Sequence, residues 1–483
     1  MTKKLTLIDG ILLVAGSMIG SGIFIVSADM GRTVGGPGWL LVLWLLAGVM
    51  TILAALSYGE LAGMMPEAGG QYVYLRRAFG PLLGFLYGWT LFLVIQCGTI
   101  AAVAVAFAKF SSYIIPSFSD QNILLKIGSL HISAAQIVGI LCIVFLTYLN
   151  SKGIKYVQFI IRYFSSAKLF ALFGLIFLGI IVFRDDVVWS SNLFQFFRTD
   201  QTWVKEGEQW VQTSLSTSGL LMAMGVGMVG SLFSSEAWNN ITFIGGEMDN
   251  PKRNIPLSMV LGTVVVTIIY LLANVSYLSL LPFYGNPEGT DVLQRGVQFA
   301  TNDRVGVEAA KVMFGGVSAP IIMAILIMVS TFACNNGLIL SGARVYQAMA
   351  KNGLFFKSMI PNNTNAVPSN ALWIQCIWCS ILCLSGKYGQ LLDYVIFAVL
   401  IFYILTILAI FRLRRLEPDT PRPIKAWGYP FIPFLYIILA AAISLDLLYM
   451  KPEYTWPGLI IVLVGIPVYY LFRANLKTSS DER

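Results

Sequence analysis

The stretch Gly16-Ser17-Met18-Ile19-Gly20-Ser21-Gly22-Ile23-Phe24 decides how this chain folds. It lies in an apolar run, from about Leu5 to Met30, that is long enough to cross a bilayer as one helix. Three glycines and two serines in seven positions disfavour an unbroken helix. Lipid tolerates unwound backbone only where protein or a watery cavity surrounds it, so the pattern predicts a helix broken near mid-membrane.

The half-helix that starts at this break would present free N–H groups and the positive end of its dipole, which together favour an anion. Small residues also allow transmembrane helices to pack closely, so close packing is the alternative reading of the same stretch. A second break elsewhere in the chain would favour the binding site over plain packing.

The composition indicates a polytopic membrane protein. Of the 483 residues, 57% are hydrophobic and 12% are charged, with a mean hydropathy of +0.75, whereas soluble domains carry about 25% charged residues. The first apolar run is too long for a signal peptide core and lacks a cleavage site, so we expect no cleaved signal. A net charge of +8 fits basic cytoplasmic loops better than nucleic-acid binding.

Hydropathy predicts an all-α membrane protein with twelve transmembrane helices. The predicted segments are 7–31, 39–64, 81–110, 133–150, 163–183, 217–245, 257–281, 317–349, 370–385, 390–411, 430–448 and 456–473. Of the 32 Lys and Arg residues, 21 fall in or beside loops on the side of the N-terminus. The positive-inside rule therefore places both termini in the cytoplasm of a cell-membrane protein. The opposite loops 184–216 and 282–316 are expected to be polar lids.

Segment six carries a second break, in Gly230-Ser231-Leu232-Phe233-Ser234-Ser235-Glu236-Ala237-Trp238-Asn239-Asn240-Ile241. An acid and two asparagines at membrane depth are costly and indicate function. Interrupted segments in corresponding halves of a chain point to a transporter site between inverted repeats. We therefore predict a transport core at 1–411, with repeat one at about 7–183, repeat two at about 217–411, and two accessory helices at 430–473.

Enzyme chemistry has little support in the sequence. The six cysteines all lie in apolar stretches, which argues against a disulfide framework and favours packing over metal binding. With one histidine and isolated acids, we expect no catalytic residues, no metal and no cofactor. Rings of like charge or repeated filter loops, which would favour an ion channel, are absent from the sequence.

Further motifs give the chain a family resemblance. It resembles the amino acid–polyamine–organocation superfamily of transporters, and within it most closely the L-type amino-acid transporters and their bacterial stand-alone relatives. Beside the two breaks, the resemblance rests on Tyr58-Gly59-Glu60-Leu61, Pro66-Glu67-Ala68-Gly69-Gly70-Gln71-Tyr72-Val73-Tyr74, Phe79-Gly80-Pro81, Gly88-Trp89, and Gly246-Glu247-Met248-Asp249-Asn250-Pro251-Lys252-Arg253-Asn254-Ile255-Pro256.

The resemblance implies the leucine-transporter-like fold of five plus five helices, with helices 1 and 6 broken. It also implies that the substrate carboxylate binds the N–H groups of Ser21 and Gly22, with Gly20 beside them. The carbonyls of Ile19, Phe233 and residue 236, with Ser234 between them, would take the substrate amino group. The physics agrees, because opposed half-helix ends offer donors to one end of a zwitterion and acceptors to the other.

Glu236 departs from the family, since many L-type members have Gly-Gly where this chain has Glu236-Ala237. The acid can pair with a cationic substrate, carry a proton, or stay hydrogen-bonded within the unwound turn, and the sequence favours this last, structural role.

Lys168 corresponds to a lysine that occupies the sodium position in L-type relatives and bridges helices 1 and 8 there, which implies sodium independence. Snorkelling to the cytoplasm is the alternative. In segment eight, Asn336 matches a polar family position, with a simple helix–helix hydrogen bond as the alternative. Trp238 completes the candidate transport residues. Tyr270, Asn274 and Tyr277 in segment seven are expected either to line the cavity or to pack in the interior, and packing is favoured.

The sequence thus predicts a secondary transporter that moves L-amino acids by alternating access, most simply by sodium-independent exchange of neutral amino acids. A proton-coupled importer or a carrier of cationic amino acids or polyamines is the alternative. In eukaryotic members a cysteine after segment three ties a heavy chain, and the matching loop from Ile114 to His131 has none, so no heavy-chain partner is expected. Glu60, Glu247 and Arg344 are candidates for a cytoplasmic gate or for interfacial anchoring.

Overall fold

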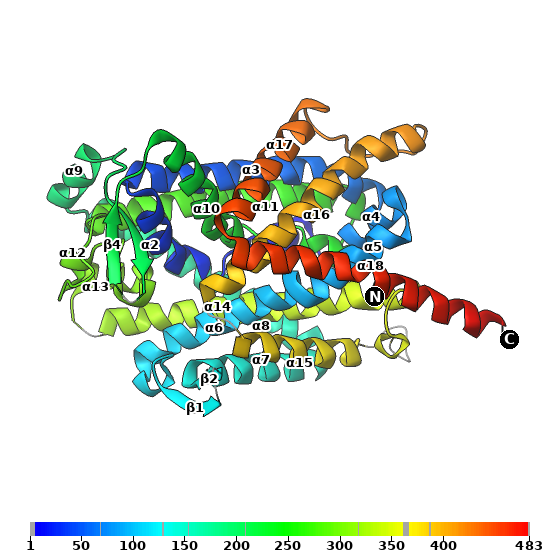
Figure 1. Cartoon of the computed structure of the whole chain (residues 1–483), viewed down its shortest axis with the longest axis horizontal. Helices are drawn as coiled ribbons and strands as arrows, with labels where there is room; N and C mark the ends of the chain where they lie inside the picture. The colour runs from blue at the N-terminus through cyan, green and yellow to red at the C-terminus, as the bar shows by residue number, and fades with distance from the viewer. Residues whose placement is uncertain are drawn as a thin grey trace.

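The computed structural model describes residues 5–67, 69–127, 130–152, 154–207, 209–316, 318–360, 367–385 and 388–481. These residues form one bundle of mostly parallel and antiparallel helices (Figure 1). The α-helices are α1 (Leu7–Met18), α2 (Gly22–Val34), α3 (Pro37–Met64), α4 (Gln71–Phe79), α5 (Pro81–Thr90), α6 (Gln96–Ile114), α7 (Ala134–Lys152), α8 (Ile154–Phe177), α9 (Asp186–Phe194), α10 (Thr217–Ser234), α11 (Pro251–Leu280), α12 (Val292–Arg295), α13 (Val305–Phe314), α14 (Ser318–Lys351), α15 (Ser369–Ser385), α16 (Tyr388–Leu416), α17 (Phe431–Met450) and α18 (Pro452–Asp481).

Shorter elements complete the chain. Two π-helical segments, η1 (Leu91–Ile95) and η3 (Leu178–Val182), continue α5 and α8. The 3-10 segments are η2 (Pro116–Phe118), η4 (Asn240–Glu247), η5 (Thr301–Asp303) and η6 (Lys357–Met359). Two antiparallel hairpins pair β1 (Ile123–Ile127) with β2 (Leu130–Ser133) and β3 (Thr202–Glu206) with β4 (Gln209–Thr213). Both hairpins lie in loops, which hydropathy alone did not resolve.

Nine helices in the described part of the chain are long and apolar enough to cross a membrane, and two bent helix pairs raise the number to eleven. α15 covers the ninth predicted segment but has 17 residues, which span about 26 Å against a hydrocarbon core of about 30 Å. The helical membrane fold is therefore confirmed, and twelve crossings remain a prediction.

The predicted break in the first segment is present. α1 begins with a capping box between Thr6 and Asp9 and ends at Met18, and α2 begins at Gly22 after a bend of 45°. Ile19 has extended backbone angles, so the helix unwinds there, before the glycine and serine that sequence propensity marks as weak.

The second break follows α10, which ends at Ser234 instead of continuing through the predicted segment 217–245. Ala237 has a φ of 70°, a left-handed conformation that costs a non-glycine residue about 1–3 kcal/mol. The chain then continues as the 3-10 segment η4. Irregular backbone of this kind persists in a membrane protein only where neighbouring helices enclose it, and Trp238, Asn239 and Ile241 are all buried.

Helices that are distant in sequence enclose the two breaks. α1 packs against α11 and α14, and α2 packs against α10. α3 and α11 form an extensive interface in which a Cβ on Gly48 would lie 2.2 Å from Thr267 Cγ2, so only glycine permits the close approach. The breaks therefore lie inside the bundle.

The end of the bundle that carries β3, β4, α9, α12 and α13 is called the hairpin end here, and α18 ends at the opposite side (Figure 1). Loops 184–216 and 282–316 were predicted to be polar lids, yet they form an ordered layer at the hairpin end. α13 buries Val305, Val307 and Ala309 against α2 and α14. The apolar residues of α13 form a run that is too short to be recognised as a membrane-spanning segment, so hydropathy assigned them to a loop.

At the opposite end, Glu60 is buried and forms ion pairs with Arg414 at 2.6 Å and Arg422 at 3.1 Å. Its carboxylate also accepts the N–H of Ala426. Arg344 donates to Gln347 on its own helix, and the side chain of Glu247 lies outside the described residues. The ion pairs of Glu60 thus tie α3 to Arg414 of α16 and to Arg422 in the segment after it, and a gate of Glu60, Glu247 and Arg344 stays a prediction.

Candidate functional site

The two breaks meet at Gly22 and Ser234. A Cβ placed on Gly22 would lie 1.9 Å from Ser234 Oγ and 2.8 Å from Ser234 Cβ. Both distances are far below van der Waals contact, so the first turn of α2 can approach the end of α10 only because residue 22 is glycine. The candidate residues from segments one and six therefore form a single site.

The donor side of this site is the first turn of α2. Ser21 is its N-cap residue, and the side chain makes no capping hydrogen bond but lies 3.2 Å from the hydroxyl of Tyr388 on α16. The leading N–H groups of an α-helix have no acceptor within the helix, and the helix dipole adds partial positive charge there. Ser21 and Gly22 thus lie at a helix N-terminus, and carboxylate binding there stays a prediction. Gly20 packs beside Cys334, whose Sγ lies 3.2 Å from the position of a Cβ.

Lys168 reaches the unwound part of segment one. Its Nζ donates to the carbonyls of Gly16 and Ile19, the latter at 2.8 Å. Ser330 on α14 donates to the same Ile19 oxygen at 3.3 Å. Lys168 is 1% exposed, so its charge lies inside the bundle. Lys168 and α14 are therefore connected through the carbonyl oxygen of Ile19, which accepts hydrogen bonds from both Lys168 and Ser330.

Tyr270 on α11 joins the two breaks directly. Its hydroxyl lies 2.9 Å from the carbonyl oxygen of Met18 and 2.8 Å from that of Ser234. A phenol has one proton to donate, so it serves only one of these two carbonyls at a time. Nearby, Tyr277 donates to Ile23 O and Ser27 donates to Asn274. The sequence expectation of plain packing missed this role, because spacing along α11 does not reveal which backbone lies opposite.

On the segment-six side, Phe233 packs its ring edge-on against Tyr388, with centroids 6.1 Å apart. The carbonyl of Phe233 accepts the N–H of Glu236 at 3.1 Å, which closes a turn after the helix. The Ser234 hydroxyl donates back to Gly230 O at 2.8 Å. Phe233 and Ser21 thus both contact Tyr388, which makes this tyrosine a neighbour of both breaks.

Glu236 directs its carboxylate towards α16, where it accepts a hydrogen bond of 2.7 Å from Tyr403. Trp238 is buried beside it, with its ring 4.9 Å from that of Tyr58 and 5.5 Å from that of Tyr403. An aromatic cluster from α3, α16 and the break therefore surrounds the acid. The partner comes from another helix, so the acid joins segment six to segment ten.

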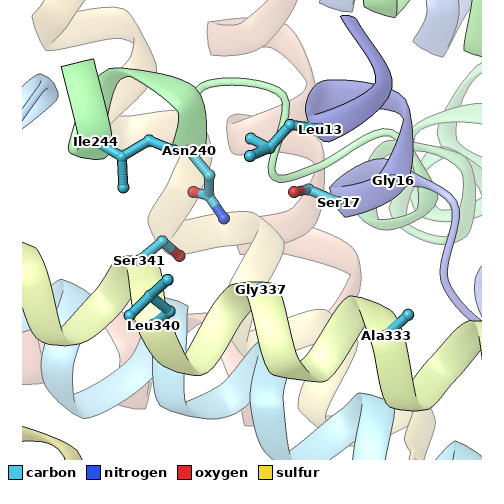
Figure 2. Close-up of a pocket in the computed structure, with 9 residues that line it drawn as sticks. All are labelled: Leu13, Gly16, Ser17, Asn240, Ile244, Ala333, Gly337, Leu340 and Ser341. Atoms are coloured by element: carbon cyan, nitrogen blue, oxygen red, sulfur yellow. The ribbon is translucent and has the colours of Figure 1, made fainter. Parts of the chain in front are cut away.

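Small cavities follow the inner side of the breaks. One of about 30 Å³ lies between α1, η4 and α14, with Ser17, Asn240 and Ser341 on its walls (Figure 2). The Asn240 side chain points into it, and Nδ2 of this buried residue has no hydrogen-bond partner among the described residues. Two more, of about 20 and 10 Å³, adjoin Glu236. Each has room for about one or two water molecules.

Asn336 lies away from these cavities. Its Oδ1 accepts a hydrogen bond of 2.8 Å from Asn150 Nδ2 on α7, and both residues are buried. Such a bond between membrane helices contributes about 0.6 kcal/mol. The neighbouring Gly337 lines the cavity instead. The geometry thus places Asn336 in a helix–helix contact, the alternative that the sequence had left open.

Among the residues that the structure describes, no three His, Cys, Asp or Glu side chains are close enough together to hold a metal ion. The site instead combines helix-end N–H groups, unwound carbonyls, one lysine and one carboxylate. Helix-end N–H groups attract anions, and unwound carbonyls attract cations.

Comparison with known proteins identifies the family. A profile of the amino acid permease family matches residues 5–469. The human large neutral amino acids transporter small subunit 2 is 26% identical over 473 residues, which cover 97% of this chain and 80% of that protein.

Two mouse proteins are similarly related. The b(0,+)-type amino acid transporter 1 is 27% identical over 478 residues, covering 97% of this chain and 88% of its own length. The Asc-type amino acid transporter 1 is 26% identical over 474 residues, covering 97% and 81%. The chain therefore belongs to the amino acid permease family and is a multi-pass membrane transporter of amino acids, not an enzyme.

Proposed function

We propose that this transporter exchanges neutral L-amino acids across the cell membrane, independently of sodium, by alternating access around the paired breaks. The observation that carries the proposal is the contact of Gly22 with Ser234, which brings a helix N-terminus and an unwound carbonyl segment together inside the bundle. The relative named for large neutral amino acids supports a neutral substrate.

In this proposal the substrate carboxylate binds the N–H groups of Ser21 and Gly22. The amino group binds the carbonyls of Phe233 and residue 236, and the carbonyl of Ile19 contributes only when its bond to Lys168 lengthens. Phe233 covers the site from one side, where its ring meets Tyr388. Substrate binding and release then require the two breaks to separate slightly.

Sodium independence rests on Lys168. Its ammonium group lies at the unwound carbonyls of Gly16 and Ile19, where a metal cation would otherwise find oxygen ligands. We expect uptake of labelled leucine, by purified protein in liposomes preloaded with leucine, to be unchanged when choline replaces sodium. Lys168→Ala should slow exchange about tenfold or more, because hydrogen bonds from a charged donor contribute about 1.5–3 kcal/mol each.

The matched control is Lys311→Ala, which removes an exposed lysine at the hairpin end and should leave the rate unchanged. A steep dependence of wild-type uptake on sodium would contradict the assignment. Liposomes without internal amino acid separate exchange from net uptake, since an exchanger needs substrate on both sides.

The same proposal includes the organisation of the chain. Two inverted repeats at about 7–183 and 217–411 account for one break in each half, and helices 430–473 are accessory. Both termini lie in the cytoplasm by the distribution of basic residues. The chain works without a disulfide-linked heavy chain, because all six cysteines lie among the described residues and are buried. Activity of the isolated chain in liposomes tests this.

A further inference from the structure

The connection between α16 and α17, residues 417–430, lies at the boundary between hydrocarbon and water. Both helices are long and apolar enough to cross a membrane. α17 has 20 residues, which span about 30 Å and so match the thickness of the hydrocarbon core. Its first residue, Phe431, therefore lies at one face of that core, and the residues before it lie among the lipid headgroups. The connection is at the edge of the bundle (Figure 1).

This connection is held in place by side chains and is not a loose loop. Arg422 donates to the carboxylate of Glu60 at 3.1 Å and to the carbonyl of Glu417 at 2.9 Å, so it joins the connection to α3 and to the end of α16. Tyr429 packs its ring against the guanidinium group of Arg414 at 3.7 Å. The fold therefore fixes which side chains of the connection face outward.

Two of the outward side chains are cations without a partner. Arg415 at the end of α16 and Lys425 in the connection are both exposed, and neither forms an ion pair among the described residues. The carboxylate of Glu417 is already paired with Arg77 at 2.6 Å. Asp419 is the other acid of the connection. The connection therefore presents a surplus of positive charge to the headgroup layer.

Aromatic rings lie beside these cations. Trp427 is 68% exposed and Phe431 is 80% exposed, and Phe434 follows one turn further along α17 with 57% exposed. Tryptophan is enriched at membrane interfaces, where its ring lies at the level of the headgroups. Arginine binds phosphate oxygens through paired N–H donors. Unpaired cations followed by exposed rings thus match a phosphate group followed by acyl chains.

We propose that the connection between α16 and α17 binds an anionic phospholipid, with its phosphate and headgroup at Arg415 and Lys425 and its first acyl carbons on Trp427 and Phe431. A zwitterionic lipid fits less well, because its own ammonium group balances its phosphate. Each basic residue near an anionic lipid surface raises the affinity about fivefold. The proposal does not depend on which amino acid the protein carries.

The test measures which lipid lies against Trp427. Purified wild-type protein is placed in phosphatidylcholine liposomes in which about one lipid in ten is brominated, either as phosphatidylglycerol or as phosphatidylcholine. Bromine on the acyl chains quenches tryptophan fluorescence on contact. The difference between wild type and Trp427→Phe isolates the signal of Trp427 from the other tryptophans, of 11 in all. Brominated phosphatidylglycerol should quench this signal more strongly, with a preference of about tenfold or more.

The double variant Arg415→Gln with Lys425→Gln should quench equally with both lipids, because it removes the surplus charge and keeps the rings. The matched control is Lys351→Gln with Lys357→Gln, which removes two exposed lysines from the same end of the bundle and should keep the preference. Potassium chloride at about 1 M, where the screening length is about 3 Å, should weaken the preference of the wild type.

Three results would overturn the inference: equal quenching of Trp427 by the two brominated lipids in the wild type, a preference that survives the loss of both cations, or equal loss of preference in the control pair. A single elution peak in size-exclusion chromatography shows that both double variants fold. None of these measurements uses amino-acid exchange, so failure of the lipid site and failure of the proposed function are distinguished.

Discussion

At the scale of single residues, the site depends on the missing side chain of Gly22 and on the charged side chain of Lys168. Gly22 lets α2 approach α10, and Lys168 satisfies carbonyls that the unwound helix leaves open. Both residues could be identified in the sequence, because glycine within an apolar run and lysine within a span are each rare and costly. Their partners could not be identified, since they lie more than a hundred residues away.

Gly22→Val should abolish exchange while the protein still folds. Even the single Cβ of Gly22→Ala would overlap Ser234 Oγ at 1.9 Å, and such overpacking costs about 1–3 kcal/mol. The exchange rate of Gly22→Ala should fall about tenfold or more in the leucine-loaded liposome assay. Adding Ser234→Gly to Gly22→Ala should recover part of the activity, because it removes the overlapping atoms.

The control for this prediction is Gly174→Ala on α8, where nothing lies within 4 Å of the new Cβ. A single elution peak in size-exclusion chromatography would show that the Gly22 variants fold. Near wild-type exchange by a well-folded Gly22→Val would refute the assignment of this site.

At the scale of elements, polar side chains hold the broken segments where regular helix hydrogen bonds end. Tyr270 connects both breaks to α11. At the hairpin end, Arg32 of α2 donates to Asp303 Oδ1 of η5 at 2.9 Å and to Gln298 O, and lies 4.9 Å from the ring of Trp210. The half-helix α2 is thus tied to the layer of loops that covers it.

Asp303 makes this tie dependent on pH. Burial opposes its ionisation, but the positive charges of Arg32 and Lys109 outweigh burial and hold the pKa of Asp303 at about 2, below the ordinary value of about 3.9. A carboxylate with a lowered pKa stabilises the fold above its unfolded pKa and loses that contribution as pH falls through its folded pKa. The contribution should therefore disappear between about pH 4 and about pH 2.

Asp303→Asn should lower thermal stability at neutral pH by about 1–3 kcal/mol, because the buried Arg32 loses a charged partner. Its melting temperature should also fall less than that of the wild type across the acid window. Asp200→Asn provides the control, since the Arg198–Asp200 pair at the same end is exposed and exposed pairs contribute little. Equal effects of the two substitutions would argue against a tie between α2 and η5.

At the scale of the whole molecule, the proposed orientation places the hairpin end outside the cell and the chain ends in the cytoplasm. One exposed residue at each end of the bundle allows a direct test. Glu288 lies in the loop before α12 at the hairpin end, and Lys351 is the last residue of α14, at the other end. Native cysteines will not interfere, since all six are buried.

In intact cells, a membrane-impermeant maleimide should label Glu288→Cys at once and Lys351→Cys only after permeabilisation. The opposite pattern would reverse the proposed topology, and the wild-type protein provides the unlabelled background. This result bears on the direction of transport, because it decides which side of the membrane the layer at the hairpin end faces.

The sequence by itself determined the apolar helices, the helical membrane fold and the positions of both breaks. These features follow from local composition: hydrocarbon excludes unpaired backbone, so the glycine, serine and asparagine clusters mark where helices fail. The family motifs further indicated an amino-acid transporter, which the match to the amino acid permease family confirmed.

Only the tertiary structure decided which groups complete the site. Tyr403 opposite Glu236, Tyr270 between the breaks, Asn150 opposite Asn336, and Asp303 opposite Arg32 all join helices or loops far apart in the chain. Hydropathy records how apolar a segment is, not which face meets which neighbour, and the folded loops at the hairpin end are too short to register. Side-chain contacts across the packed bundle set these pairings, because within the membrane every buried polar group gains by finding a partner.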